Sequence, residues 1–195
     1  RIIYKKADII IFQAQFLRNL FLKRINLRSV KSKILPNECN NKKLSYKKRI
    51  IKEEITLGFA APMYWSCKGL GIIVNLYESL VKRKVNFKLF IAGKGPQSYK
   101  LIEKLSKISK RNFVWKGWVD NIYSFFNQID LLIIPSKYDS CPNLLLEGLN
   151  SNKMMFVSNI AAHKEIIKNK ELIFSINNID LLVKKIIKLK KSKKY

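Results

Sequence analysis

The sequence predicts an α/β fold: a doubly wound, Rossmann-like parallel sheet with helices packed on both of its faces. From Ile55 onward, short apolar runs alternate with longer amphipathic segments, which is the pattern of β-α units around a parallel sheet. The chain has 195 residues and a hydrophobic content of 48%, which suits one domain plus a piece of another and excludes disorder caused by low hydrophobicity. A sheet of this kind is expected to have a binding crevice at the carboxyl ends of its strands.

Before this domain, the sequence predicts two short strands with one helix between them, at Ala7–Ala14, Gln15–Ile25 and Lys33–Pro36. So few elements cannot bury a core by themselves. We therefore interpret residues 1–36 as the end of a preceding N-terminal domain, and we expect them not to join the main sheet. The polar stretch Asn37–Lys48 is typical of a linker. We place the hinge at residues 37–54 and the main domain at residues 55–195.

The main domain is predicted to alternate strands with helices. The strands are the short apolar runs, expected at Ile55–Ala61, Phe87–Ala92, Asn112–Lys116, Ile129–Pro135, Met154–Ser158 and Leu172–Ser175. The helices are the amphipathic segments, expected at Lys68–Lys82, Ser98–Ser109, Ile122–Asn127, Pro142–Asn150 and Ile179–Lys191. The fourth helix is predicted to have proline in its first turn, where the missing N–H is not needed.

The densest run of positive charge extends from Lys184 to Lys194, and Leu182, Ile186 and Leu189 lie at helical spacing there. We favour a terminal helix that docks by this apolar stripe and exposes its lysines to solvent. The alternative is a helix that lies on an anionic membrane surface.

The formal net charge of +26 raises the question of a nucleic-acid partner. Most of the positive residues are lysines, and isoleucine and asparagine are also frequent, as drift toward A/T-rich codons would produce. Specific readers of bases and phosphates depend on the arginine fork instead. We therefore expect no specific nucleic-acid partner.

The sequence also gives expectations about the compartment. No uncharged apolar run is long enough to span a bilayer, and we expect no signal peptide. Cys39, Cys67 and Cys141 are odd in number and widely spaced, so they predict neither a disulfide framework nor a zinc site. We expect a cytoplasmic protein with no metal, and peripheral contact with the inner face of the plasma membrane is the second option.

The most informative segment lies between the fourth strand of the main domain and the helix that follows it. The strand is expected to end at Pro135 and the helix to begin at about Pro142. The N–H groups of Asn143 and Leu144 would then be free and would face the crevice. Because the N-terminus of a helix carries a partial positive charge, this arrangement predicts an anion site suited to a diphosphate.

Two carboxylates flank this helix start. Asp139 lies in the loop above it, and Glu147 follows Asn143 by one helical turn, so that Asn143 and Glu147 share a helix face.

The string IIPSKYDSCPNLLLEGLNSNKMMFVSN, which begins at Ile133, resembles the donor-site signature of the family 4 retaining glycosyltransferases of the GT-B fold. The resemblance keeps the order of the family's motifs from about Lys6 to about Lys190. It extends to the segments ADIIIFQAQFLRNLF, ILPNE, FIAGKGP and NFVWKGW, to Asp130-Leu131, and to Glu165 in AAHKEII.

The resemblance implies a function. In such enzymes a nucleotide-diphosphate sugar binds the C-terminal domain and the acceptor, a saccharide or a lipid-linked molecule, binds the N-terminal domain. The sugar is transferred with retention, here in the synthesis of a cell-surface polysaccharide or lipopolysaccharide, without a metal or another cofactor. The main domain would then be the C-terminal half of a GT-B fold, and residues 1–36 the end of the acceptor-side domain.

The resemblance also implies the role of each site residue. Asp139 would lie near the hydroxyls of the donor sugar, Glu147 would bind the ribose, and Lys68, in a Lys-Gly pair that opens a helix, would pair with the diphosphate. Further donor contacts are expected from Gly93, Lys94, Gly95, Ser140, Pro142, Asn143 and Leu144.

The sequence departs from the family at two places. The first carboxylate is Asp139 instead of the usual glutamate. No arginine lies a few residues before the Lys-Gly pair, where Phe59–Pro62 stands instead. Two consequences are open: weaker binding of the diphosphate, or a second phosphate contact from Lys94. Enzymes of this family have a histidine in their N-terminal domain. His163, the one histidine of this chain, is expected in the turn before Glu165 and is no substitute for it.

Other interpretations of single residues are open. Gly93 and Gly95 could permit a tight turn without touching a ligand. Trp65, Trp115 and Trp118 are expected to be packing residues, not sugar platforms, and Glu165 is expected to cap or pair near a helix start. The alternative for the whole chain is a truncated, catalytically inactive basic module that binds nucleotides or anionic surfaces.

Overall fold

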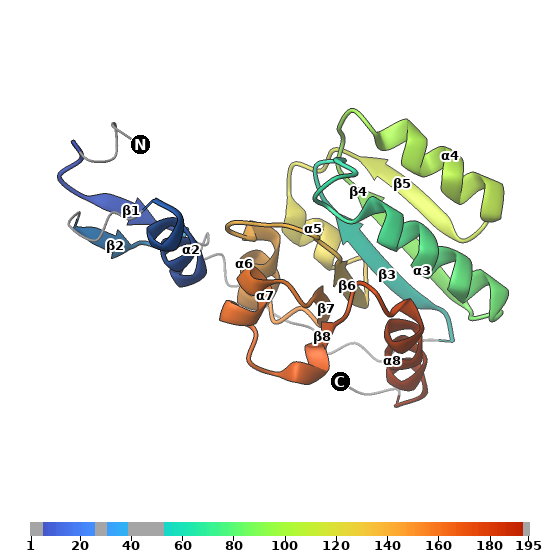
Figure 1. Cartoon of the computed structure of the whole chain (residues 1–195). Coiled ribbons are helices and arrows are strands. Elements are labelled where there is room, and N and C mark those ends of the chain that lie inside the picture. The colour runs from blue at the N-terminus through green and yellow to red at the C-terminus, as the bar shows by residue number, and fades with distance from the viewer. Residues whose placement is uncertain (1–5, 26–30, 39–52, 193–195) are drawn as a thin grey trace.

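The computed structural model describes residues 6–25, 31–38 and 53–192, and the two sheets in these ranges are separate (Figure 1). The larger sheet has six strands, all parallel, in the order β5-β4-β3-β6-β7-β8. The strands are β3 (Ile55–Ala60), β4 (Phe87–Ala92), β5 (Phe113–Gly117), β6 (Leu131–Ile134), β7 (Met155–Ser158) and β8 (Ile173–Phe174). The strand order reverses between β3 and β6, as in a Rossmann-type sheet, so the predicted doubly wound fold is confirmed.

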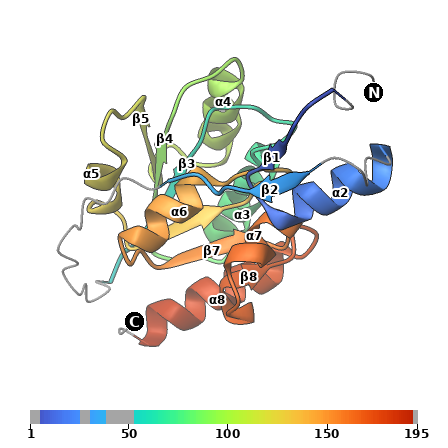
Figure 2. The same ribbon diagram turned by 90° about the vertical axis from the view of Figure 1, so that its left-hand side faces the viewer.

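Helices cover both faces of this sheet (Figures 1 and 2). One face carries α3 (Leu70–Lys82), α4 (Ser98–Ile108) and α8 (Ile179–Ser192), with α3 packed between the other two. The other face carries α5 (Ile122–Phe126), α6 (Asn143–Asn150) and α7 (Ala161–Ile166). A short 3-10 helix, η1 (Lys170–Leu172), precedes β8.

The strands contribute side chains alternately to the two faces. In β6, Leu131 and Ile133 join the core under α3, while Leu132 and Ile134 join the core under α5 and α6. All four are buried, which explains why this strand is an unbroken apolar run in the sequence. The core holds the carboxyl ends of the strands in place, and this edge forms the candidate site.

The N-terminal elements form a unit of their own. Its strands β1 (Ile10–Phe12) and β2 (Ser32–Ile34) pair in parallel with each other and not with the six-stranded sheet, as expected, and α2 (Gln15–Ile25) packs on them. Most of the predicted linker Asn37–Lys48 lies outside the described residues.

A carboxylate of the main domain caps the N-terminus of α2. The two oxygens of Glu165 accept hydrogen bonds from the backbone N–H groups of Gln15 (2.7 Å) and Phe16 (2.9 Å). A negative side chain at a helix N-terminus satisfies free N–H groups and complements the helix dipole. The prediction that Glu165 caps a helix start is therefore confirmed, and the capped helix belongs to the N-terminal unit.

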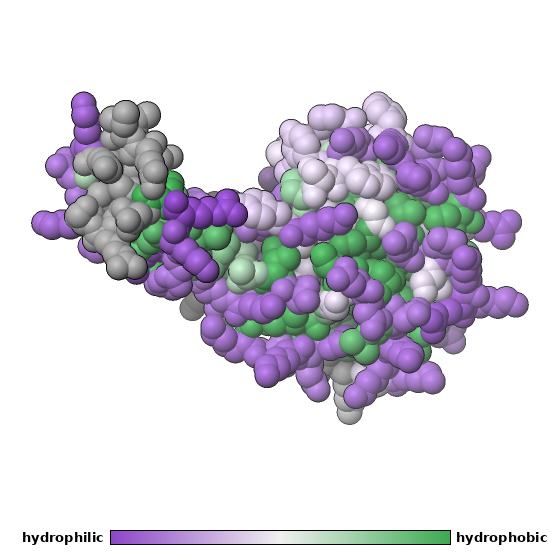
Figure 3. Space-filling model, in the orientation of Figure 1, coloured by the Kyte–Doolittle hydropathy of each residue, from purple (hydrophilic) through white to green (hydrophobic). Residues whose placement is uncertain are grey.

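The last helix docks on the main domain. Leu182 and Ile186 of α8 are fully buried, Leu189 packs against the same core, and Lys184 and Lys188 are exposed. Figure 3 shows hydrophilic side chains around the edge of the main domain and a band of hydrophobic ones across its middle. The favoured interpretation, an apolar stripe docked in the fold, is confirmed for these residues. Within the described ranges, no helix has the length and apolarity that crossing a membrane requires.

Candidate functional site

A cleft of about 450 Å³ opens at the carboxyl ends of β3, β4, β5 and β6, and the strand order reverses between β3 and β6. Its volume lies in the range of small-molecule sites. The lining residues come from four strand ends, the start of α6 and the loop before α3: Phe59–Pro62, Lys68, Ala92, Gly93, Trp118–Asp120, Ile122, Ile134–Ser136, Asp139, Cys141–Leu144 and Glu147. The cleft thus lies where a doubly wound sheet is expected to bind its ligand.

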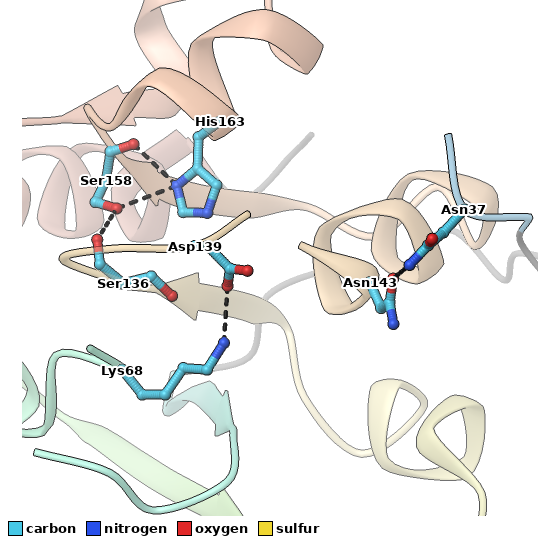
Figure 4. Close-up of polar contacts among 7 residues, drawn as sticks. All are labelled: Asn37, Lys68, Ser136, Asp139, Asn143, Ser158 and His163. Atoms are coloured by element: carbon cyan, nitrogen blue, oxygen red, sulfur yellow. Dashed lines mark hydrogen bonds and ion pairs between the residues drawn. The ribbon is translucent and has the colours of Figure 1, made fainter. Parts of the chain in front are cut away.

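An ion pair lies in this cleft. The Lys68 Nζ is 2.8 Å from the Asp139 Oδ2 (Figure 4), and the two side chains are 24% and 11% exposed. Their loops are joined by a backbone hydrogen bond, because the Lys137 N–H donates to the Cys67 carbonyl at 2.7 Å. Lys68 lies before α3, not in it as predicted, since the left-handed conformation of Gly69 (φ 70) precedes the first helical residue.

The start of α6 differs from the prediction. Pro142 is the N-cap residue and lies outside the first turn. The Asn143 N–H is not free, because it donates to the Cys141 carbonyl at 3.0 Å. The Leu144 N–H forms no hydrogen bond within the described residues, so it is the donor that this helix start offers to an anion in the cleft.

Glu147 lines the cleft from α6 and is half-buried. In the described part of the chain its carboxylate has no hydrogen-bond or ion-pair partner, and burial raises its pKa. A carboxylate in this state is free to accept hydrogen bonds from a ligand.

One residue of the predicted turn Gly93-Lys94-Gly95 lines the cleft. Gly93 lines it, whereas Lys94 and Gly95 do not. A Cβ on Gly93 would lie 1.9 Å from the Ala61 carbonyl oxygen, and its φ is 116. A Cβ on Gly95 would lie 2.7 Å from the backbone nitrogen of Met63. Both glycines are therefore required by the close approach of two backbone segments.

Two of the expected donor contacts, Lys94 and Ser140, do not line this cleft. Lys94 is exposed and does not line the cleft, and its contact with a phosphate stays a prediction. The wall beside Lys68 is formed by the apolar segment Phe59–Pro62. Ser140 is also exposed and absent from the lining of the cleft, and its contact with the donor stays a prediction.

The sequence missed one aromatic residue of the cleft. Trp118 is 62% exposed and its Nε1 donates to the Asp120 Oδ1 at 3.0 Å, so the packing prediction is wrong for this residue. It is confirmed for Trp65 and Trp115, which pack against the core. The signal that could have identified Trp118 is its position directly after β5, at the edge where the ligand is expected.

His163 lies behind the ion pair, in α7 instead of the predicted turn. It is fully buried, and its Nδ1 is 3.0 Å from the Ser158 carbonyl oxygen (Figure 4). Burial lowers the pKa of His163, and the hydrogen bond to Ser158 and the nearby Asp139 carboxylate partly offset that effect.

No three His, Cys, Asp or Glu side chains in the described ranges gather in a way that could hold a metal ion. That the protein needs no metal stays a prediction.

The comparisons with known proteins agree with this geometry. The family model "Glycosyl transferases group 1" matches residues 54–192. An uncharacterized glycosyltransferase, MJ1059, from Methanocaldococcus jannaschii is 26% identical over 158 residues, which cover 76% of this chain and 39% of that protein. The O-antigen biosynthesis glycosyltransferase WclY from Escherichia coli is 27% identical over 161 residues, which cover 80% of this chain and 44% of that protein. The chain thus spans less than half the length of these curated relatives.

Solved structures of glycosyltransferases show the same fold. A variant of S. aureus TarM in complex with fondaparinux, alpha-GlcNAc-glycerol and UDP has a TM-score of 0.85 at 18% identity, covering 96% of this chain and 38% of that one. The pneumococcal O-GlcNAc transferase GtfA in complex with UDP and GlcNAc has a TM-score of 0.78 at 14% identity, covering 96% and 39%. The fold is that of the GT-B glycosyltransferases, and the family model covers most of the chain. This chain therefore belongs to the group 1 glycosyl transferases.

Proposed function

We propose that this chain forms the donor-binding wall of an enzyme that transfers a sugar from a nucleotide-diphosphate donor to a saccharide or lipid-linked acceptor, with retention at the anomeric carbon. One observation carries the proposal: the cleft at the reversal of strand order contains the Lys68 ammonium, the carboxylates of Asp139 and Glu147, and a helix N-terminus. A cation and a helix start suit a diphosphate, and carboxylates suit the hydroxyls of ribose and sugar.

The diphosphate is assigned to Lys68 and the start of α6. The Lys68 ammonium and the Leu144 N–H both belong to residues that line the cleft. Negative charge grows on the diphosphate as it leaves the sugar, so an ammonium already in place stabilises the transition state more than the ground state. In this mechanism catalysis comes from leaving-group stabilisation and positioning, without a protein nucleophile or a metal.

The carboxylates are assigned to the two sugars of the donor. Glu147, which has no partner in the described residues, accepts hydrogen bonds from the ribose hydroxyls. Asp139, at the other side of the helix start, accepts them from the transferred sugar. Hydrogen bonds to a charged acceptor are stronger than those between neutral groups. Both contacts therefore help to hold the donor in a defined orientation.

The acceptor is assigned to the N-terminal domain of the enzyme. Residues 1–36 are the end of that domain. The separate sheet of the N-terminal unit supports this domain assignment, with the hinge at residues 37–54. The relative WclY, whose name places it in O-antigen biosynthesis, supports a role in the synthesis of a cell-surface polysaccharide or lipopolysaccharide.

The cysteine pattern supports a cytoplasmic location. Peripheral contact with an anionic membrane would depend on the exposed lysines of α8, because the apolar stripe of that helix is buried in the fold.

Calorimetry with UDP and GDP tests the proposal. We expect the chain to bind at least one of them, and Lys68→Met to weaken the affinity about 10–100-fold, the scale of one charged hydrogen bond. Lys94→Met is the matched control, because Lys94 is exposed and outside the cleft, and it should leave the affinity unchanged. Equal losses for both variants, with binding that disappears in salt, would support the alternative of a basic module that binds anions without a specific site.

A further inference from the structure

The ion pair between Lys68 and Asp139 occupies the place where the donor must bind. In the proposed function, on which this inference rests, Lys68 binds the diphosphate, and this draws its ammonium from the Asp139 Oδ2, now at 2.8 Å, toward the phosphate oxygens. The Asp139 side chain is only 11% exposed, so water replaces little of the lost contact. Hydroxyls of the donor sugar donate hydrogen bonds to this carboxylate but bring no positive charge, and a carboxylate of low exposure with no cation beside it is unfavourable.

A buried imidazole stands behind this carboxylate. His163 Nδ1 is 3.0 Å from the Ser158 carbonyl oxygen, which can only accept a hydrogen bond, so Nδ1 carries a proton. The Ser158 Oγ, 3.1 Å from Nδ1, donates its own proton to the Ser136 carbonyl at 2.5 Å. These hydrogen bonds fix the tautomer and leave Nε2 as an unprotonated acceptor.

The Nε2 atom is buried and has no hydrogen-bond partner among the described residues. Figure 4 shows the ring between Ser158 and Asp139, with Nε2 on the side of the ring away from Ser158. An unsatisfied buried acceptor is rare in folded proteins and calls for a reason. This open acceptor belongs to a ring that the Asp139 carboxylate influences electrostatically.

The charged groups around His163 are few. Asp139 and Lys68 act on it in opposite directions, and Ser136 and Ser158, from the ends of β6 and β7, are neutral. On its own helix, Lys164 is exposed and the Glu165 carboxylate is bound to the start of α2. The charge state of His163 therefore depends on whether Lys68 neutralises Asp139.

We propose that His163 is a positioning residue that takes up a proton on Nε2 when Lys68 leaves Asp139 for the donor diphosphate. The imidazolium then replaces Lys68 as the cation beside Asp139. The proton comes from water or buffer, one for each donor bound, and the new N–H bond is the one covalent change. Donor binding is then favoured by protons, so the affinity increases as the pH falls, by up to about tenfold per pH unit.

The first test needs no ligand. The chain contains one histidine, so a single Cε1–H resonance in an NMR titration reports on His163. Lys68→Met imitates the departure of the ammonium, and we expect it to raise the midpoint by about one pH unit or more. Lys137→Met removes an exposed lysine from the same loop as Asp139 and should leave the midpoint unchanged. Adding Asp139→Asn to Lys68→Met should return it to the wild-type value. A midpoint that is the same in Lys68→Met and wild type overturns the proposal.

The second test measures the proton itself. Calorimetry with UDP-glucose at pH 7 in two buffers of different ionisation enthalpy should show an uptake approaching one proton, because the phosphates of this donor do not titrate near that pH. His163→Gln should bind without proton uptake. Binding with no proton uptake in the wild type overturns the role of His163 and leaves the proposed function standing. Absence of binding overturns the proposed function, and the NMR titration then decides the coupling of His163 to Asp139 alone.

Discussion

At the residue scale, the three charged residues of the proposed mechanism differ in whether they have an ionic partner before a ligand binds. Lys68 and Asp139 hold each other at 2.8 Å, so the donor has to compete with an existing contact at that end of the cleft. Glu147 has no partner in the described residues and is half-buried, so it is already available to a ligand. The fold thus keeps one carboxylate neutralised and leaves the other ready to accept hydrogen bonds.

Glu147→Gln should weaken the binding of UDP and GDP but make the fold more stable at neutral pH. A neutral amide is a poorer acceptor for ribose hydroxyls, and a loss of about 1–3 kcal/mol is the scale for one charged hydrogen-bond partner. Calorimetry on both proteins measures this loss. Glu103→Gln, which changes an exposed carboxylate on α4, is the control and should leave binding unchanged. Unchanged affinity in Glu147→Gln for both nucleotides would remove Glu147 from the site.

The stability effect of the same variant has a defined sign. Burial raises the pKa of Glu147 above its ordinary value of 4.5, so the folded protein binds this proton more tightly than the unfolded chain does. The charged form therefore destabilises the fold above the raised pKa, and the effect vanishes below pH 4.5. Glu147→Gln should raise the Tm by about 1–2 °C at pH 7 and not at pH 4. A lower Tm at pH 7 would show that the carboxylate is stabilised by the fold.

At the element scale, α8 shows how a strongly basic segment is used. Leu182 is fully buried against the core that α3 shares, while its neighbour Leu181 is 44% exposed. The two leucines are therefore a matched pair on one helix. Comparing their substitution by alanine distinguishes docking of α8 on the fold from a role at the protein surface.

Leu182→Ala should destabilise the protein by about 2–5 kcal/mol, because it leaves a cavity in the core. Leu181→Ala should change the stability by less than about 1 kcal/mol, since that side chain is partly in solvent already. Urea unfolding followed by circular dichroism measures both. Equal effects of the two substitutions would mean that α8 is not docked by this face.

The apolar runs predicted the six strands of the main domain in order, because strands buried on both faces, such as β6, are continuous apolar runs. The helix α7 (Ala161–Ile166) was not predicted. The ends of the elements were less predictable. Lys68 is left outside α3 by the positive φ of Gly69, and a capping conformation of this kind is not specified by the sequence pattern. The turn that engages the Asn143 N–H also depends on local geometry.

The site itself was predicted in part. Motif resemblance pointed to Lys68, Asp139 and Glu147, and the structure brings all three to one cleft. The exposure of Trp118 and the buried hydrogen bonds of His163 were not predicted, because both arise from tertiary packing; for Trp118, its position directly after β5 was the signal available in the sequence.

At the scale of the whole molecule, the chain contains one wall of the cleft that the proposed function needs. The N-terminal unit is attached through the cap that Glu165 places on α2 and through a hydrogen bond of 2.7 Å from the Asn37 side chain to the Asn143 Oδ1. The second contact ends on α6, beside the residues that line the cleft (Figure 4).

We expect the chain as it stands to bind nucleotide diphosphate but to transfer no sugar. Without the opposite wall, water reaches the donor sugar and nothing holds an acceptor at the anomeric carbon, and much of the rate advantage of an enzyme comes from that positioning. Incubation with radiolabelled nucleotide sugars and saccharide or lipid-linked acceptors is the test. Transfer by the purified chain would show that residues 1–36 supply far more of the acceptor site than we assign to them.

A crystal structure of the chain with bound UDP tests the central claim most directly. The account predicts that the diphosphate lies in the cleft at the reversal of strand order, between the Lys68 Nζ and the Leu144 N–H, with the ribose hydroxyls on the Glu147 carboxylate and Lys68 moved away from Asp139. UDP bound outside this cleft, or inside it with the Lys68–Asp139 ion pair intact and Glu147 without contact to the ribose, would contradict the account.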